Sequence, residues 1–349
     1  MKIITCASFY GSGSSALTDL VAEYSTVKDL TDYEFSFLYG LDGVSDLEYH
    51  LCECHDRNNS GHAIKRFKRL SDFNAGTFFN SRYEPFFDNK YKMLTDKYIE
   101  SLIELKHDGW WFYDLYDRGK LYYYVKMEIS HILRKLTKGK KDILSKEQTL
   151  CAHPSEEKFL KCTKDYVAAL VRAANKENKP YLEVDQIVPS QNINRILRYF
   201  SDDIYVFVVD RDPRDIYASN RFYWKDHVCP IDDVNTFCDW FLYTRESGSK
   251  EKYDESRVCR LKFEDLIYKY DETVAEIERI TGLNAQDHKL QFRKLNPKHS
   301  VNNTQVWKRH DIDSDIKVIE SRLADYLYPF EEVDGNEIPG VVHENMKTF

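Results

Sequence analysis

Apolar and polar residues along the chain follow patterns that predict strands followed by helices. Residues Lys2–Ser8 form a short β-prone run, and Ala16–Tyr24 have the apolar spacing of a helix. The segment Gly11–Ser15, which contains only glycine and serine, lies between them. The N-terminus is therefore predicted to form a strand, a turn and a helix.

A second unit of this kind occurs late in the chain. Asp203–Val209 is an apolar strand that ends at the charged turn Asp210–Asp215, and Ile216–Ser219 follows as the start of a helix. Between the two units, Pro180–Asp185 and Asn192–Phe200 predict another strand and its helical crossover.

One more strand is predicted at Arg257–Phe263, followed by a helix over Ile267–Ile280 that stops at Gly282. Continuous apolar strands that alternate with helices are typical of a parallel sheet covered on both faces. We therefore expect an α/β fold with a central parallel sheet and flanking helices.

Residues 40–179 interrupt this rhythm. They are rich in aromatic and charged residues and contain helical patches at Met93–Leu105 and Tyr122–Leu136. We interpret them as a mainly helical insertion for acceptor binding, within a single domain that spans residues 1–349. Residues 330–349 are expected to be a peripheral C-terminal extension.

Composition and charge add limits to this picture. The 349 residues are 42% hydrophobic and 14% aromatic, which is enough to bury a sizeable core. The formal net charge of −8 gives no overall attraction to nucleic acid, so no nucleic-acid partner is expected. Two basic stretches, Lys65–Arg69 and Arg134–Lys141, are either solvated faces or contacts for an anionic acceptor or cofactor.

The sequence shows no secretory signal, spanning segment or metal motif. The first ten residues lack a basic start, a long apolar run and a cleavage site, and no segment reaches the roughly 18 apolar residues of a spanning helix. We expect a cytoplasmic protein of a bacterial type, although membrane attachment by other means and the oligomeric state stay open. The eight cysteines include no paired CxxC spacing, so we expect reduced thiols and no metal.

The glycine and serine segment after the first strand suits an anion. Glycine lets the backbone approach closely, so that successive N–H groups and serine hydroxyls can bind a phosphate or a sulfate. The segment lacks the lysine and the glycine spacing of GxxxxGK[ST], which disfavours an ATP- or GTP-hydrolysing loop. A loop of this kind can also merely turn the chain.

The segment Val206–Ser219 resembles the 3′-phosphate-binding motif of sulfotransferases that use 3′-phosphoadenosine 5′-phosphosulfate (PAPS). In that family, an arginine just past the strand and a serine eight residues later bind the 3′-phosphate of the cofactor. Arg211 and Ser219 match these positions, and they supply a permanent planar cation and a hydroxyl donor. Arg214 and the neighbouring aspartates could instead form a structural salt-bridge network.

The resemblance extends to three more segments. Tyr10–Leu17 is similar to the family's phosphosulfate loop, Leu261–Leu266 to its Tyr-Glu-Asp-Leu strand end, and Val306–His310 to its late Trp-Lys segment. The resemblance implies the P-loop-like sulfotransferase fold and PAPS as the donor. The loop residues that it implies for cofactor binding are Gly11, Ser12, Gly13, Ser14 and Ser15.

The family's pattern breaks at two places. Gly11 stands where relatives carry the Lys or Arg that neutralises the leaving group, so another cation or a dense set of hydrogen-bond donors should replace it. Lys65 and Arg66 in the insertion are the candidate cations. Ser300–Asn302 stands in place of the family's Arg-Lys-Gly segment. The residues expected to take over its contacts are Asn302, Asn303 and Lys308.

An attacking acceptor hydroxyl must lose a proton, which requires a carboxylate or a histidine within hydrogen-bond reach. In relatives this base often lies just after the second strand, and the corresponding segment here is Val27–Phe35, so Glu34 is the first candidate. Asp185 is the second, because it ends a central strand and ligands bind at the carboxyl edge of a parallel sheet. Either carboxylate could instead be a helix cap or a member of an ion pair.

Together these features predict a sulfotransferase that moves a sulfuryl group from PAPS to a hydroxyl or amine. The aromatic segments Trp110–Tyr113 and Tyr122–Tyr124 favour a carbohydrate acceptor, although such residues more often fill a core, and a lipid or small hydroxylated molecule is the alternative. A nucleotide-dependent kinase shares the strand, loop and helix. A non-catalytic nucleotide-binding protein is favoured by the missing cation at Gly11.

Overall fold

The computed structural model falls into two compact units, Met1–Leu38 with Asn175–Phe349, and Tyr39–Ala174. The second unit coincides for most of its length with residues 40–179, whose assignment as an insertion into a single domain stays a prediction. The residues that the structure describes are 1–30, 33–77, 79–109, 114–144 and 147–341.

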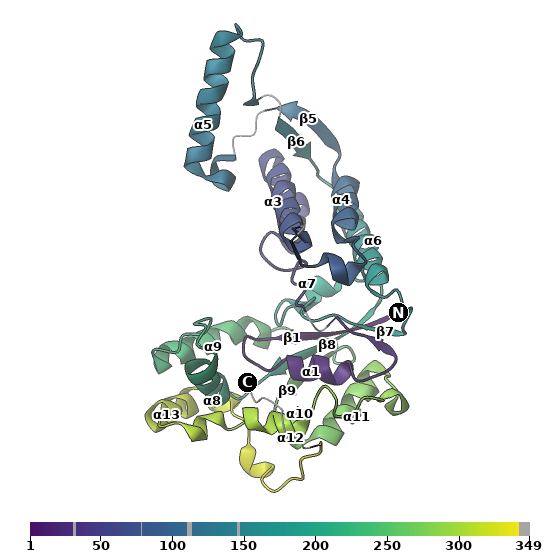
Figure 1. Cartoon of the computed structure of the whole chain (residues 1–349), viewed down its shortest axis with the longest axis vertical. Helices are drawn as coiled ribbons and strands as arrows, with labels where there is room; N and C mark the ends of the chain where they lie inside the picture. The colour runs from purple at the N-terminus through teal and green to yellow at the C-terminus, as the bar shows by residue number, and fades with distance from the viewer. Residues whose placement is uncertain (31–32, 78, 110–113, 145–146, 342–349) are drawn as a thin grey trace. The chain divides into compact units, whose positions relative to one another are not determined.

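The first unit is built on a five-stranded parallel sheet with the order β2-β7-β1-β8-β9 (Figure 1). Strand β1 lies at its centre, between β7 and β8. This confirms the expected α/β fold with a central parallel sheet and flanking helices. The strands are β1 (Lys2–Ser8), β2 (Val27–Lys28), β7 (Tyr181–Glu183), β8 (Asp203–Asp210) and β9 (Val258–Lys262).

The central strands are apolar because both faces of the sheet are covered. β1 pairs with β8 along its whole length, from Lys2 opposite Asp203 to Ser8 opposite Val209. Every residue of β1 between its two ends is buried, so its sequence is a continuous apolar run rather than an alternating one.

Helices α1, α10 and α11 lie on the same side of the sheet (Figure 1), where Leu17, Leu266 and Ile277 pack with Ile4 and Cys6 of β1. A second apolar cluster joins α8, α9 and α13. The helices of this unit are α1 (Ser15–Val21), α7 (Ile193–Leu197), α8 (Pro213–Ser219), α9 (Val234–Ser249), α10 (Asp265–Tyr268), α11 (Tyr270–Thr281), α12 (Pro297–Ser300) and α13 (Asp313–Arg322). Shorter helical turns lie at Asn220–Trp224, Ala285–Asp287, Val301–Asn303, Val306–Arg309, Ala324–Tyr326 and Phe330–Glu332.

The helix predicted over Ile267–Ile280 is wrong in one respect, because it is divided into α10 and α11. Lys269, between them, has φ −127° and ψ 39°, which no α-helix accommodates. The predicted stop is confirmed, since Gly282 adopts φ 76° after the last turn of α11. Of the expected C-terminal extension, Phe330 and Val333 are buried in a small cluster with Tyr328, and residues 342–349 lie outside the described part.

The second unit is mainly helical. Its core contains Phe67 of α3, Tyr98 of α4 and Tyr166 of α6, and the rings of Tyr98 and Tyr166 stack with centroids 4.6 Å apart. No helix in the described part of the chain is long and apolar enough to cross a membrane. The elements of this unit are α2 (Val44–Glu48), a turn at Tyr49–Glu53, α3 (Arg57–Ala75), β3 (Gly76–Thr77), β4 (Asn80–Ser81), a turn at Glu84–Phe87, α4 (Tyr91–Leu102), β5 (Leu105–Gly109), α5 (Asp114–Leu136), β6 (Glu147–Cys151) and α6 (Glu156–Ala174).

Candidate functional site

The loop between β1 and α1 adopts a conformation that requires glycine at two positions. Gly11 and Gly13 have φ values of 74° and 78°, in the left-handed region. A Cβ atom on Gly13 would lie 2.6 Å from the ring of Phe263, and one on Gly11 would lie 3.2 Å from the ring of Trp224. Any side chain at Gly13 would therefore displace Phe263 from its place beneath the loop.

The loop presents several hydrogen-bond donors. The N–H of Ser12 closes a turn on the carbonyl of Phe9 at 3.1 Å. Its hydroxyl is buried and has no hydrogen-bond partner among the residues that the structure describes. Within the same residues, the N–H groups of Gly13, Ser14 and Ser15 donate no hydrogen bond. Four donors are thus available to an anion.

These donors line a pocket of about 460 Å³. Glu34 also lines it, so the pocket brings together the loop and the first candidate base, both found from the sequence. Gln186 and Trp224 complete the wall, and no sequence motif marked either of them. Gln186 is held in place by Ser8, whose N–H donates to Oε1 of Gln186 at 3.4 Å and whose hydroxyl accepts from its amide.

Arg211, in the segment that resembles the 3′-phosphate-binding motif, contacts both the loop and Ser219 of its own segment. The side chain is only 2% exposed. Its guanidinium donates from Nη1 to the carbonyl of Gly11 at 3.4 Å, and from Nη2 to the hydroxyl of Ser219 at 3.2 Å and to the carbonyl of Asn303. It also lies 5.1 Å from the centroid of Phe263. Nε of Arg211 is buried without an acceptor among the described residues.

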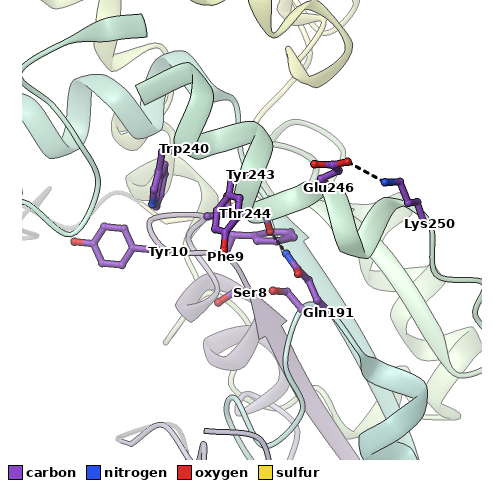
Figure 2. Close-up of a pocket in the computed structure, with 10 residues that line it drawn as sticks. Ser8, Phe9, Tyr10, Gln191, Trp240, Tyr243, Thr244, Glu246 and Lys250 are labelled. Atoms are coloured by element: carbon purple, nitrogen blue, oxygen red, sulfur yellow. Dashed lines mark hydrogen bonds and ion pairs between the residues drawn. The ribbon is translucent and has the colours of Figure 1, made fainter. Parts of the chain in front are cut away.

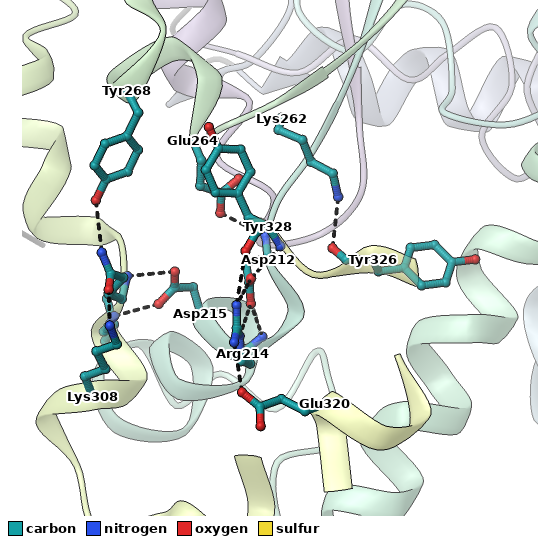
Figure 3. A network of polar contacts seen from close by, with 12 residues as sticks. Asp212, Arg214, Asp215, Lys262, Glu264, Tyr268, Lys308, Glu320, Tyr326 and Tyr328 are labelled. Atoms are coloured by element: carbon teal, nitrogen blue, oxygen red, sulfur yellow. Dashed lines mark hydrogen bonds and ion pairs between the residues drawn. The ribbon is translucent and has the colours of Figure 1, made fainter. Parts of the chain in front are cut away.

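The neighbouring charges form a structural network (Figure 3), as the alternative interpretation of Arg214 proposed. Arg214 donates from Nε to Oδ1 of Asp212 at 3.0 Å, from Nη2 to Oδ2 of Asp212 at 2.7 Å, and from Nη1 to Glu320 at 2.9 Å. Asp215 accepts the N–H groups of Gln305 and Val306 at 2.9 and 2.6 Å. These contacts fix α8 and thereby the position of Ser219.

Asn302 and Lys308, the remaining cofactor candidates, do not line the pocket of about 460 Å³ at the loop, which we call the loop pocket. The amide of Asn302 donates to the carbonyl of His299 at 3.0 Å. Lys308 donates to Gln305 and lines a different cavity, of about 350 Å³. Lys65 lies in α3 of the second unit, where it lines a cavity of about 360 Å³. The roles of these three residues stay predictions.

Glu34 and Asp185 follow the neighbouring strands β2 and β7. The segments that carry Glu34 and Asp185 are adjacent, since the N–H of Phe35 donates to the carbonyl of Asp185 at 3.0 Å. Asp185 is 7% exposed, and its Oδ1 has no hydrogen-bond partner in the described part of the chain. Burial first, and then the charge of Glu34, raise the pKa of Asp185 to about 7. A carboxyl group that titrates near neutral pH thus lies close to the loop pocket.

A larger pocket adjoins the first one (Figure 2). Its volume is about 780 Å³, and it shares Ser8, Phe9 and Tyr10 with the loop pocket. Trp240 and Tyr243 of α9 add aromatic rings, and its polar residues are Ser190, Gln191, Thr244, Glu246 and Lys250.

The aromatic residues singled out in the sequence lie elsewhere. Tyr122–Tyr124 are on α5 of the second unit, and Trp110–Tyr113 lie outside the described residues. No sequence motif marked Trp240 and Tyr243, because an aromatic pair on one helix face is equally compatible with a core.

Comparisons with known proteins add little to this geometry. No protein-family model matches the chain, and no curated protein sequence matches it significantly. Sulfotransferase STF1 from Mycobacterium tuberculosis matches 93% of this chain and 77% of its own, at 12% identity and a TM-score of 0.37. Retinol dehydratase, in complex with androsterone and the inactive cofactor PAP, matches 94% and 83%, at 12% identity and a TM-score of 0.39. STF1 is a sulfotransferase, the family that the motifs resemble. The identities and TM-scores of both matches are too low to support a conclusion about this chain.

Proposed function

We propose that the protein is a sulfotransferase that moves a sulfuryl group from PAPS to a hydroxyl or amine of an acceptor. The observation that carries the proposal is the contact of Arg211 with Gly11 and Ser219. Two motifs that resemble the same family, and that lie 200 residues apart in the sequence, meet through this one buried guanidinium. A fold that used Arg211 only as an internal ion-pair partner would place a carboxylate on it, whereas its acceptors here are two carbonyls and a hydroxyl.

The donor set fits a nucleotide with two separate anionic groups. The hydroxyl of Ser12 and the N–H groups of Gly13 to Ser15 would bind the 5′-phosphosulfate. Arg211 and Ser219 would bind the 3′-phosphate, which would also give Nε of Arg211 an acceptor. The turn at Val301–Asn303 has to shift for this contact, because the carbonyl of Asn303 occupies Nη2 of Arg211.

When bound, PAPS supplies the sulfuryl group and a phosphate leaving group. The loop donors stabilise negative charge at that end of the pocket, and they stand in for the lysine that Gly11 replaces. Lys65 is a proposed additional cation. Glu34, which lines the pocket, accepts the proton of the acceptor hydroxyl, and Asp185 behind it is the second candidate for this role.

We place the acceptor in the pocket of about 780 Å³, because it shares three residues with the loop pocket. A carbohydrate is the favoured acceptor. The rings of Trp240 and Tyr243 offer faces on which a sugar can stack. Glu246 and Lys250 are paired at 2.9 Å, and each can exchange this ion pair for hydrogen bonds to hydroxyl groups of the sugar.

The test is Arg211→Ala, measured by calorimetry with 3′-phosphoadenosine 5′-phosphate and with adenosine 5′-phosphosulfate, which lacks the 3′-phosphate. Since a charge-assisted contact contributes roughly 1.5–3 kcal/mol, binding of the first ligand should weaken about ten- to a hundredfold, and that of the second should hardly change. Arg211→Lys, which keeps the charge, should fall between the parent and Arg211→Ala.

Two outcomes would contradict the assignment. Equal losses for both nucleotides would mean that Arg211 supports the fold, and parental preference for ATP would favour a kinase.

The missing cation at Gly11 favours a second candidate function, a non-catalytic nucleotide-binding protein. A screen of carbohydrate acceptors with labelled PAPS separates these, since binding of 3′-phosphoadenosine 5′-phosphate without any transfer would support the second candidate.

A further inference from the structure

Helix α5 of the second unit carries an apolar stripe that faces solvent. Gly119, with φ 79° and ψ 163°, interrupts the helix, so the continuous part runs over residues 120–136. Five aliphatic residues follow one another there at steps of four, four, three and four, which places them along one face. Their exposed fractions are 80% for Leu121, 49% for Val125, 46% for Ile129, 53% for Ile132 and 76% for Leu136.

The opposite face of the helix is the one that contacts its own chain. Ser130 is buried and donates to Oδ1 of Asp142 at 2.5 Å, and Arg134 donates to Oδ2 of Asp142 at 2.5 Å. The segment after α5 therefore returns along the polar side. The first turn of α5 contacts α3, since Asp117 pairs with His62 at 3.4 Å and with Arg69 at 2.6 Å. Beyond this turn, Figure 1 shows α5 leading away from α3. An aligned row of exposed aliphatic side chains of this kind marks an interaction surface.

The charge around the stripe indicates its partner. Residues 118–141 contain eight basic residues and one acidic residue, in a chain whose formal net charge is −8. A second copy of the chain would bring this positive segment against itself, which is repulsive. An anionic lipid surface attracts it, and exposed Tyr122 and Tyr124 beside the stripe are residues that favour the membrane interface.

We infer that residues 120–141 form a membrane-surface segment that docks on anionic phospholipid. The aliphatic stripe would enter the boundary between headgroups and acyl chains, while the lysines contact the headgroups. A helix of this length is about 25 Å long and lies in the surface plane rather than spanning the bilayer. This inference does not depend on the proposed activity.

The test is flotation of the whole protein with vesicles of phosphatidylcholine and phosphatidylglycerol in equal amounts, compared with pure phosphatidylcholine. The parent should bind the anionic vesicles more tightly. Ile132→Gln should weaken this binding about tenfold, and Leu121→Gln with Ile132→Gln about a hundredfold, because each removes an aliphatic side chain from the lipid. His131→Gln is the matched control, since this exposed neighbour lies outside the stripe and its change should leave binding as it was.

A second set of variants tests the charge. Replacing Lys138, Lys140 and Lys141 by glutamine should weaken binding to the anionic vesicles about fivefold for each lysine and leave binding to pure phosphatidylcholine unchanged. All of these positions are at least partly exposed, so thermal unfolding should match that of the parent.

Three outcomes would overturn the inference. The first is a parent that does not bind anionic vesicles. The second is an equal effect of Ile132→Gln and His131→Gln. The third is a dimer in lipid-free solution, seen by sedimentation, that Ile132→Gln dissociates, because a second copy of the chain would then cover the stripe.

Discussion

Strands β7 and β8 flank β1 and both lead into acidic residues, but the two strand ends differ in their partners. After β8, Arg245 donates to Asp210 at 2.7 and 3.1 Å, and Arg214 binds Asp212 through two hydrogen bonds. At the end of β7, Asp185 forms no ion pair with any residue that the structure describes.

This difference sets the pKa values in opposite directions. Burial raises the pKa of Asp210, but the hydrogen bonds and charge of Arg245 outweigh it and lower the pKa below the usual range. Burial also raises the pKa of Asp185, and the charge of Glu34 raises it further, to about 7. The cation beside Asp210 outweighs its burial, whereas the charge beside Asp185 adds to the effect of burial. The ion pair of Asp210 and Arg245 stabilises the fold, whereas Asp185 is buried without a cation among the described residues.

The largest expected effect tests the paired end. Arg245→Met should lower the free energy of unfolding by about 3–5 kcal/mol, because it leaves the buried charge of Asp210 without its guanidinium partner. Denaturant unfolding measures the loss. Arg279→Met is the control, since the pair between Arg279 and Glu276 is at the surface and should contribute little. An Arg245→Met protein as stable as the parent would remove the distinction between the two strand ends.

The next prediction concerns how Asp185, at the unpaired end, makes the stability of the protein depend on pH. The folded-state pKa of Asp185 is about 7, above its usual value near 4, so the folded protein holds this proton more tightly than the unfolded chain. Stability should therefore fall as pH rises from about 4 to about 7, by up to about 4 kcal/mol. Asp185→Asn should remove the share of this decline that Asp185 contributes, as measured by unfolding at several pH values, while the share of Glu183, Asp215 and Glu264, whose pKa values burial also raises, should remain. A parent and a variant with parallel profiles would show that Asp185 has an ordinary pKa.

The third prediction concerns which of the two carboxylates, Glu34 or Asp185, is the proposed general base. Glu34→Gln should lower turnover by on the order of 10²-fold or more, because it removes the proposed general base, and should leave the affinity for 3′-phosphoadenosine 5′-phosphate nearly intact. Asp185→Asn is the control in the same steady-state assay. An unimpaired Glu34→Gln enzyme beside an inactive Asp185→Asn enzyme would transfer the role to Asp185.

The smallest effect tests the coupling between these two groups. Since the charge of Glu34 raises the pKa of Asp185, Glu34→Gln should move the pH-dependent decline in stability toward lower pH. The shift is measured from the unfolding profile of the parent and the variant. An unchanged midpoint would mean that burial alone raises the pKa of Asp185.

Elements and motifs that depend on neighbouring residues could be predicted from the sequence. β1 and β8 are largely apolar runs, and Gly11 and Gly13 stand where the turn needs a left-handed backbone. Ser219 ends α8 and follows Arg211 by 8 residues, so a pattern within one short segment was enough to pair them. Periodicity and backbone freedom are properties of short segments, and the sequence states them directly.

The sequence by itself thus determined the parallel α/β sheet, the glycine and serine loop after β1, and the pairing of Arg211 with Ser219. Only the tertiary structure decided that Asp210 pairs with Arg245 while Asp185 has no cation among the described residues, that Arg211 contacts Gly11, and that Lys308 lines a cavity other than the loop pocket. Gln186 and Trp224 likewise enter the site only through folding. The reason is that a pKa or a pocket wall depends on distances between residues far apart in the chain, and no local pattern encodes those distances.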